Sequence, residues 1–164
     1  MKHSSILVLA VIAVFLTAAF STAALTQTYL VQGFAPGFDD LMTMLVQPRH
    51  IRLYFAGTAK NWELAAAESR DLRASLDRVA QGVPNYLGSD VAQSLKTFTT
   101  PKLDALDAAI AGANSDQFAA AYDNLTKGCN DCHTDMKRSF LVIKRPEGAG
   151  ADAAHPDQDF KPNP

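Results

Sequence analysis

Apolar side chains recur every three or four residues along a stretch of the chain that contains both of its cysteines. They are Phe118, Tyr122, Leu125, Cys129, Cys132, Met136 and Phe140. Residues at this spacing lie on one face of an α-helix, because a turn takes about 3.6 residues. We therefore predict one amphipathic helix that opens at Ser115–Asp116, runs to about Val142 and buries this face.

Earlier segments show the same helical spacing. We predict a first helix over Phe38–Ala56, which Gly57 stops, because glycine favours the backbone conformation that ends helices. A second helix is expected to begin after Asn61, a good N-cap residue, and to end by Gly82.

A third helix is expected to open at Ser89–Asp90, after a loop over residues 83–88, and to close at Gly112. Pro48 in the first helix and Pro101 in the third should each kink or reset the helix that contains it. No strand-like alternation of any length and no hairpin dipeptide occurs. Four amphipathic helices with short links predict an all-α fold, an antiparallel up-down-up-down four-helix bundle over residues 25–145.

The N-terminus has the order of a secretory signal. A basic start, Met1–Lys2–His3, precedes the apolar run Ile6–Phe20 and the small residues Ser21–Ala24. We expect residues 1–24 to be a signal peptide or an uncleaved membrane anchor, since the run falls just short of the roughly 20 residues that span a bilayer. Both alternatives place the folded part outside the cytoplasm, in the periplasm or an equivalent compartment.

Composition narrows the class of protein. The 164 residues are 48% apolar and 20% charged, with a net charge of -2, which is typical of one globular domain and argues against nucleic acid as a partner. Residues 146–164 are rich in Pro, Gly, Ala and Asp, and we expect a disordered tail. No catalytic constellation occurs, and Glu63, Glu68 and Asp71 fit a solvated helix face, so we do not expect an enzyme.

The segment Cys129–His133 has the form C-x-x-C-H, the attachment signal of c-type haem. Two thiols three residues apart share a helix face and can each add to a vinyl group on one porphyrin edge. His133 then supplies the proximal axial ligand of the iron. The motif therefore predicts one covalent haem c, and export agrees with it because this haem is attached outside the cytoplasm.

Other chemistries of a C-x-x-C pair fit less well. A zinc site needs about four ligands, and the chain has no second such pair. A thioredoxin-like motif belongs to a βαβ setting, of which there is no sign. A disulfide across so short a loop would contribute little stability, and would give the histidine no role.

With this motif late in the chain, on the last of four predicted helices, the sequence resembles the class II c-type cytochromes, the cytochrome c-prime group. The likeness covers roughly Phe34 to Arg145 as architecture, and its specific residues are Cys129, Cys132 and His133. The long tail departs from the family. The resemblance implies a helix-bundle haem protein, and many such proteins pair as homodimers, for which Tyr54, Phe55 and Trp62 are available.

The sixth iron position should face the first half of the first helix, since the end of the fourth helix lies beside it in such a bundle. Met42, Met44 and His50 are the candidate distal ligands, and family members with an apolar residue there leave the iron five-coordinate. Arg49 and Arg52 are candidates to pair with the haem propionates, with Lys137 and Arg138 behind them. The alternative is that the arginine side chains lie along the bundle surface with their charged ends in water.

These features predict an electron-transfer protein that exchanges electrons with redox partner proteins. A methionine or histidine ligand would favour that role. The alternative is a protein that binds or senses a small gas, nitric oxide or carbon monoxide, at an open distal site. The response of the optical spectrum to carbon monoxide separates the two.

Overall fold

The computed structural model describes residues 36–146 and 162, and this part of the chain is mostly helical. The predicted leader over residues 1–24 lies outside the described residues, as does the predicted tail apart from residues 146 and 162. The prediction of an all-α fold is confirmed for the described part. No helix of that part combines the length and apolar character needed to cross a membrane.

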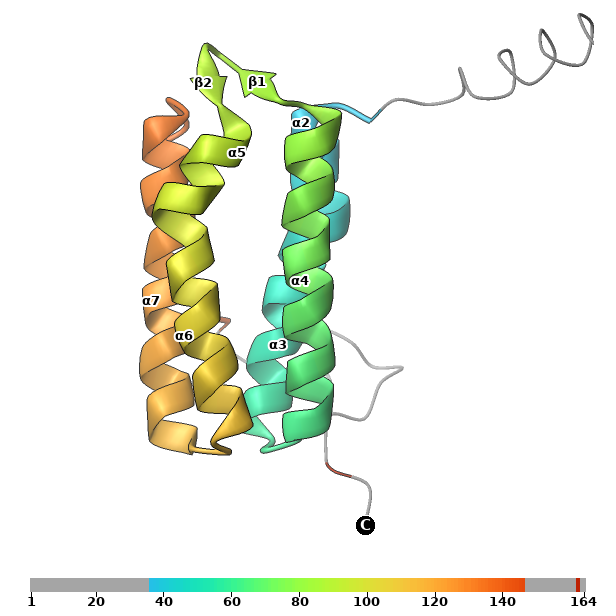
Figure 1. Ribbon diagram of the computed structural model, residues 1–164, viewed down its shortest axis with the longest axis vertical. Coiled ribbons are helices and arrows are strands. Elements are labelled where there is room, and N and C mark those ends of the chain that lie inside the picture. Colours follow the sequence, from blue (N-terminus) through green and yellow to red (C-terminus); the bar gives the residue numbers. More distant parts are fainter. Residues whose placement is uncertain (1–35, 147–161, 163–164) are drawn as a thin grey trace, which may run out of the picture. The chain divides into compact units, whose positions relative to one another are not determined.

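Four long helical segments run side by side, with α3 packed on α4, α4 on α6, α6 on α7, and α7 on α3 (Figure 1). The elements in chain order are α2 (Phe38–Leu41), η1 (Met42–Val46), α3 (Gln47–Thr58), α4 (Trp62–Gly82), β1 (Asn85–Tyr86), β2 (Ser89–Asp90), α5 (Val91–Ser94), η2 (Leu95–Thr99), α6 (Thr100–Ala111) and α7 (Ser115–Asp135). The two segments labelled η are π-helices, in which the backbone hydrogen bond skips one extra residue.

Each π-helix accommodates a proline. Pro48 and Pro101 each lie two residues beyond the end of a π-helix, and each would clash in an α-helix with the carbonyl four residues earlier. Those carbonyls belong to Met44 and Thr97, at the centres of η1 and η2. The extra residue relieves the clash without breaking the helix, so the prolines reset the register as predicted. One added residue rotates everything beyond it by about 100°.

Three helices end on a left-handed residue that is not glycine. Lys60 after α3, Ala113 after α6 and Lys137 after α7 have φ of 59°, 49° and 60°. Each end carries the paired hydrogen bonds of a Schellman motif; after α7, Arg138 N donates to His133 O at 2.7 Å and Lys137 N to Thr134 O at 3.0 Å.

Two boundary predictions are therefore wrong. Gly57 lies inside α3, which ends one residue later at Thr58, and Lys60, not Gly57, takes the left-handed conformation. The last helix ends at Asp135 instead of near Val142, and Phe140, expected to face inward, is 69% exposed. The predicted helix starts at Asn61 and Asp90 are confirmed. The side chain of Asn61 caps α4 by accepting a hydrogen bond from Leu64 N, and that of Asp90 caps α5 by accepting one from Gln93 N.

The predicted loop over residues 83–88 contains a short hairpin. Asn85 pairs with Asp90 and Tyr86 with Ser89, and the turn between them has positive φ at both Leu87 (50°) and Gly88 (89°). Two positive φ values define a type I′ turn, which fits the twist of a two-residue hairpin.

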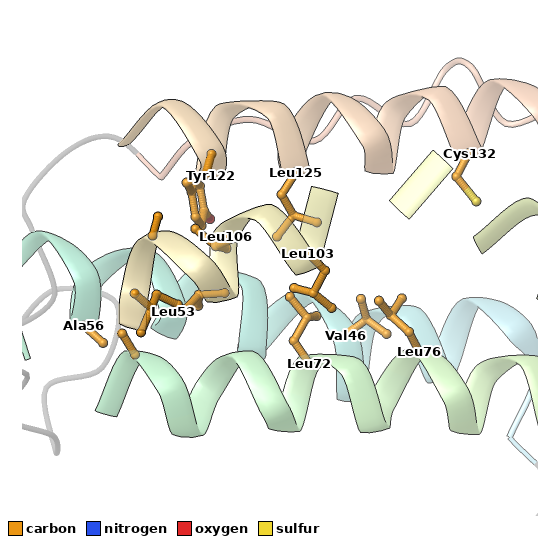
Figure 2. Close-up of a cluster of buried hydrophobic side chains, with 14 of the residues drawn as sticks. Val46, Leu53, Ala56, Leu72, Leu76, Leu103, Leu106, Tyr122, Leu125 and Cys132 are labelled. Atoms are coloured by element: carbon orange, nitrogen blue, oxygen red, sulfur yellow. The ribbon is translucent and has the colours of Figure 1, made fainter. Parts of the chain in front are cut away.

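The core lies between the helices and draws leucines from α3, α4, α6 and α7 (Figure 2). The fully buried members include Leu53, Leu72, Leu103, Leu106 and Leu125. At one end of this core the ring of Phe118 lies against Gly57, in the space that a Cβ at residue 57 would occupy. Tyr54, Phe55 and Trp62 are partly buried and pack against the core.

Candidate functional site

A cavity of about 400 Å³ lies between the first helical run and the end of α7. Its walls come from α2, η1 and the start of α3 on one side and from α7 and the following segment on the other. They are Phe38, Asp39, Met42, Thr43, Val46, Gln47, His50, Cys129, His133, Met136, Arg138, Leu141, Val142 and Ile143. A smaller chamber of about 30 Å³ shares several of these residues and adds Cys132 and Thr99.

The cavity brings together residues that lie far apart in the sequence. Cys129 and His133 line it from α7, Met42 and His50 line it from the first helical run, and Cys132 lines the adjoining chamber. Met44, a third candidate for the sixth iron position, does not line either space, and 63% of its surface is exposed.

The cysteines follow a close approach of α7 to η2 at Gly128. A Cβ on Gly128 would lie 2.5 Å from the carbonyl oxygen of Phe98, so only glycine allows this approach. Burial raises the pKa of Cys129 to about 12 and that of Cys132 to about 11, and both thiols are protonated at neutral pH. Protonated, buried thiols are poor nucleophiles in disulfide exchange. Within the described residues, no group of three His, Cys, Asp or Glu side chains converges to hold a bare metal ion.

His133 is 7% exposed and its ring has a fixed direction. Nδ1 lies 3.0 Å from the carbonyl oxygen of Leu141, in the segment that follows α7. A carbonyl only accepts hydrogen bonds, so this contact selects the tautomer in which Nδ1 carries the proton and Nε2 keeps its lone pair. Nε2 makes no hydrogen bond within the described part of the chain and is the nitrogen available to a ligand.

His50 is 5% exposed, although a straight helix would direct it to the polar side. The rotation introduced by η1 turns it inward. Its Nε2 lies 3.0 Å from Thr126 Oγ1 and its Nδ1 lies 3.0 Å from Tyr122 Oη, both on α7. Burial lowers the pKa of His50 to about 4, so the ring is neutral at pH 7. With both nitrogens engaged, His50 is a less accessible iron ligand than Met42.

Arg49 and Arg52 lie elsewhere than sequence reasoning expected. Both pair with Glu68 on α4, Arg49 Nη1 at 3.0 Å and Arg52 Nε at 2.8 Å, and neither lines the cavity. The side chain of Glu68 is only 3% exposed, which corrects its assignment to a solvated helix face. A buried carboxylate needs nearby positive charge, and this need directs both arginines away from the cavity.

Arg138 occupies the cavity wall instead. Its guanidinium pairs with Asp39 at 3.0 Å, and its Cζ lies over the rings of Tyr86 and Phe140, 5.1 Å and 5.5 Å from their centroids. Its Nε is buried and has no hydrogen-bond partner among the described residues. Lys137, by contrast, donates to the carbonyl of Leu87.

Sequence reasoning missed the contribution of the segment after α7. Leu141, Val142 and Ile143 line the cavity and Asn130, inside the C-x-x-C-H motif, hydrogen-bonds this segment. The only available signal was the apolar run Phe140–Ile143, which also fits the end of a longer helix.

The chain matches no protein-family model, and no curated protein or solved structure is significantly similar to it.

Proposed function

We propose that this chain is an exported monohaem c-type cytochrome that transfers electrons. Its fold would be an antiparallel up-down-up-down four-helix bundle that carries Cys129–His133 on its last helix. The observation that carries the proposal is the setting of the motif, because Cys129 and His133 line one side of a largely apolar cavity. The packing of α3, α4, α6 and α7 supports the bundle.

The residues at the cavity fit a haem in three respects. Its volume of about 400 Å³ is within the range of about 300–1,000 Å³ that is usual for cofactor pockets. Cys129 and Cys132 supply two thiols on one helix face, and each S–H would add across a vinyl group with no leaving group. Haem iron needs only axial ligands from the protein, so His133 with a free Nε2 suffices where a bare ion would require a cluster.

Other side chains take defined roles. Met42 lines the cavity, and we propose it as the sixth ligand, with His50 in the cavity wall, where Thr126 engages its Nε2. Arg138 lines the cavity, and its guanidinium would pair with a propionate there. Arg49 and Arg52 have no part in the proposal, since Glu68 engages both.

Bound haem c would supply a one-electron redox centre. The chain provides a mostly apolar cavity that would hold the group. Val142 lines the cavity and is nevertheless 62% exposed, so a redox partner protein could approach an occupant closely at this point.

The optical spectrum of the chain, produced with a working haem-attachment system, tests the proposal. A c-type spectrum that is low-spin and unchanged by carbon monoxide is expected for an electron carrier. A high-spin spectrum that responds to carbon monoxide would contradict the carrier role and favour gas binding. A protein without haem absorbance would contradict both.

A further inference from the structure

The segment Lys137–Arg145, which we name the C-terminal strap, turns back along α7 after the Schellman motif. Successive contacts run in opposite directions on the two segments: Leu141 meets His133, Ile143 meets Asn130, and Arg145 pairs with Asp123. Over residues 141–145 of the strap, alternate residues therefore contact α7.

Asn130 holds the strap with both ends of its amide. Nδ2 donates to the carbonyl of Ile143 at 2.9 Å, and Oδ1 accepts from the N–H of Ile143 at 2.8 Å. This reciprocal pair satisfies both polar groups of one backbone residue, so it fixes position and orientation together. Asn130 lies on the turn before His133, and Ile143 is two residues from Leu141. The clamp thus sets the place of the Leu141 carbonyl.

That carbonyl acts on the imidazole of His133. The hydrogen bond from Nδ1, 3.0 Å long, selects the tautomer with a free Nε2 and prevents rotation of the ring. A partner that accepts from the second nitrogen also makes the ligating nitrogen more basic. Greater basicity at the ligand favours ferric iron over ferrous iron and lowers the reduction potential.

From this geometry we infer that Asn130 is a positioning residue for the iron ligand. It acts through the strap to orient His133 and to lower the reduction potential of the bound haem. This inference rests on the proposed function. Asn130 is one of the two variable positions of the C-x-x-C-H motif, and haem attachment itself does not require this role.

The test compares Asn130→Ala with Thr134→Ala in the full chain after haem attachment. Thr134 is one residue from His133 on the same helix, and its hydroxyl bonds only the carbonyl of Asn130 among the described residues, at 3.0 Å. Two quantities are measured. The first is the reduction potential, and the second is the rate of amide hydrogen exchange at Ile143, which can be measured with or without bound haem. We expect Asn130→Ala to accelerate exchange at Ile143 and to raise the potential, and Thr134→Ala to change neither.

The outcomes separate the claims. Faster exchange with an unchanged potential would overturn the positioning role, and unchanged exchange would overturn the clamp itself. A chain that takes up no haem would overturn the proposed function, while exchange at Ile143 would still report on the clamp. Ile143→Pro is the second variant. It removes the N–H from which Asn130 Oδ1 accepts a hydrogen bond and leaves α7 intact. It should raise the reduction potential, as Asn130→Ala does.

Discussion

The imidazole of His50 on α3 and the phenol of Tyr122 on α7 form a buried hydrogen bond, with Nδ1 3.0 Å from Oη. Tyr122 Oη also lies 2.9 Å from the carbonyl oxygen of His50, and the other ring nitrogen bonds Thr126. The partners of the His50 ring are thus neutral groups, and none stabilises an imidazolium by opposite charge. A buried histidine in this setting resists protonation.

This resistance predicts a specific dependence of stability on pH. Unfolded His50 takes up a proton as the pH falls through about 6.5, whereas in the folded protein burial lowers the pKa to about 4. Between these values the unfolded state binds more protons, so the free energy of unfolding falls as the pH falls, by up to about 3 kcal/mol. Denaturant unfolding of the wild type and of His50→Gln from pH 7 to pH 4 measures this loss of unfolding free energy. Carboxylates titrate in both proteins, so only the difference between the two reports on His50. If the unfolding free energies of the two proteins fall in parallel with pH, the prediction is refuted.

Gly57 and Phe118 predict a second effect. The Cβ of Gly57→Ala would overlap the ring of Phe118, and both residues are buried in the core, so the ring cannot simply swing into solvent. We expect destabilisation by roughly 1–3 kcal/mol, the usual range for overpacking. Adding Phe118→Leu should recover part of this loss. A double-mutant cycle from thermal unfolding measures the coupling, and strictly additive effects would show that the ring is not the obstacle.

The end of α6 predicts a stabilising exchange of two residues. Ala113 holds the left-handed position with φ of 49°, whereas Gly112 beside it has a helical φ of -77° and room for a Cβ. Gly112→Ala together with Ala113→Gly keeps the composition and places each residue in its preferred conformation. We expect a gain of about 1 kcal/mol in unfolding free energy. Ala111→Gly, inside the helix, is the matched control and should destabilise; a loss in the exchanged variant would contradict the assignment of the helix end.

Met42 and Met44 form a natural pair for testing the sixth ligand. Met42 lines the cavity, and Met44, two residues away, is 63% exposed. In the haem-loaded chain, Met42→Leu should produce a high-spin spectrum that responds to carbon monoxide, whereas Met44→Leu should leave the spectrum unchanged. If Met42→Leu has no effect on the spectrum, another group holds the sixth position, and His50 is then the residue to replace.

Much of the local structure was predictable because it depends on neighbours in sequence. Asn61 and Asp90 cap helices through side-chain hydrogen bonds to residues three positions later, and the spacing of apolar residues identified the buried face of α7 through Met136. The end of α7 was missed because Lys137, not glycine, takes the left-handed conformation. The hairpin was missed for a related reason, since Leu87 stands where asparagine or glycine is usual.

The candidate site was predictable in its motif and not in its surroundings. Cys129 and His133 follow from a local pattern, and the cavity beside them depends on how distant helices pack. His50 faces inward because η1 rotates the helix, which periodicity cannot anticipate. Arg49 turns away because Glu68, nineteen residues later, is buried against it.

The central claim is that Cys129 and Cys132 bind one haem covalently, and the mass of the intact protein tests it most directly. The chain should be produced with a working haem-attachment system, beside a Cys129→Ser, Cys132→Ser control. We predict a mass greater than that of the polypeptide by one haem, with no thiol left to react with an alkylating agent. An unmodified mass with two reactive thiols would contradict the account.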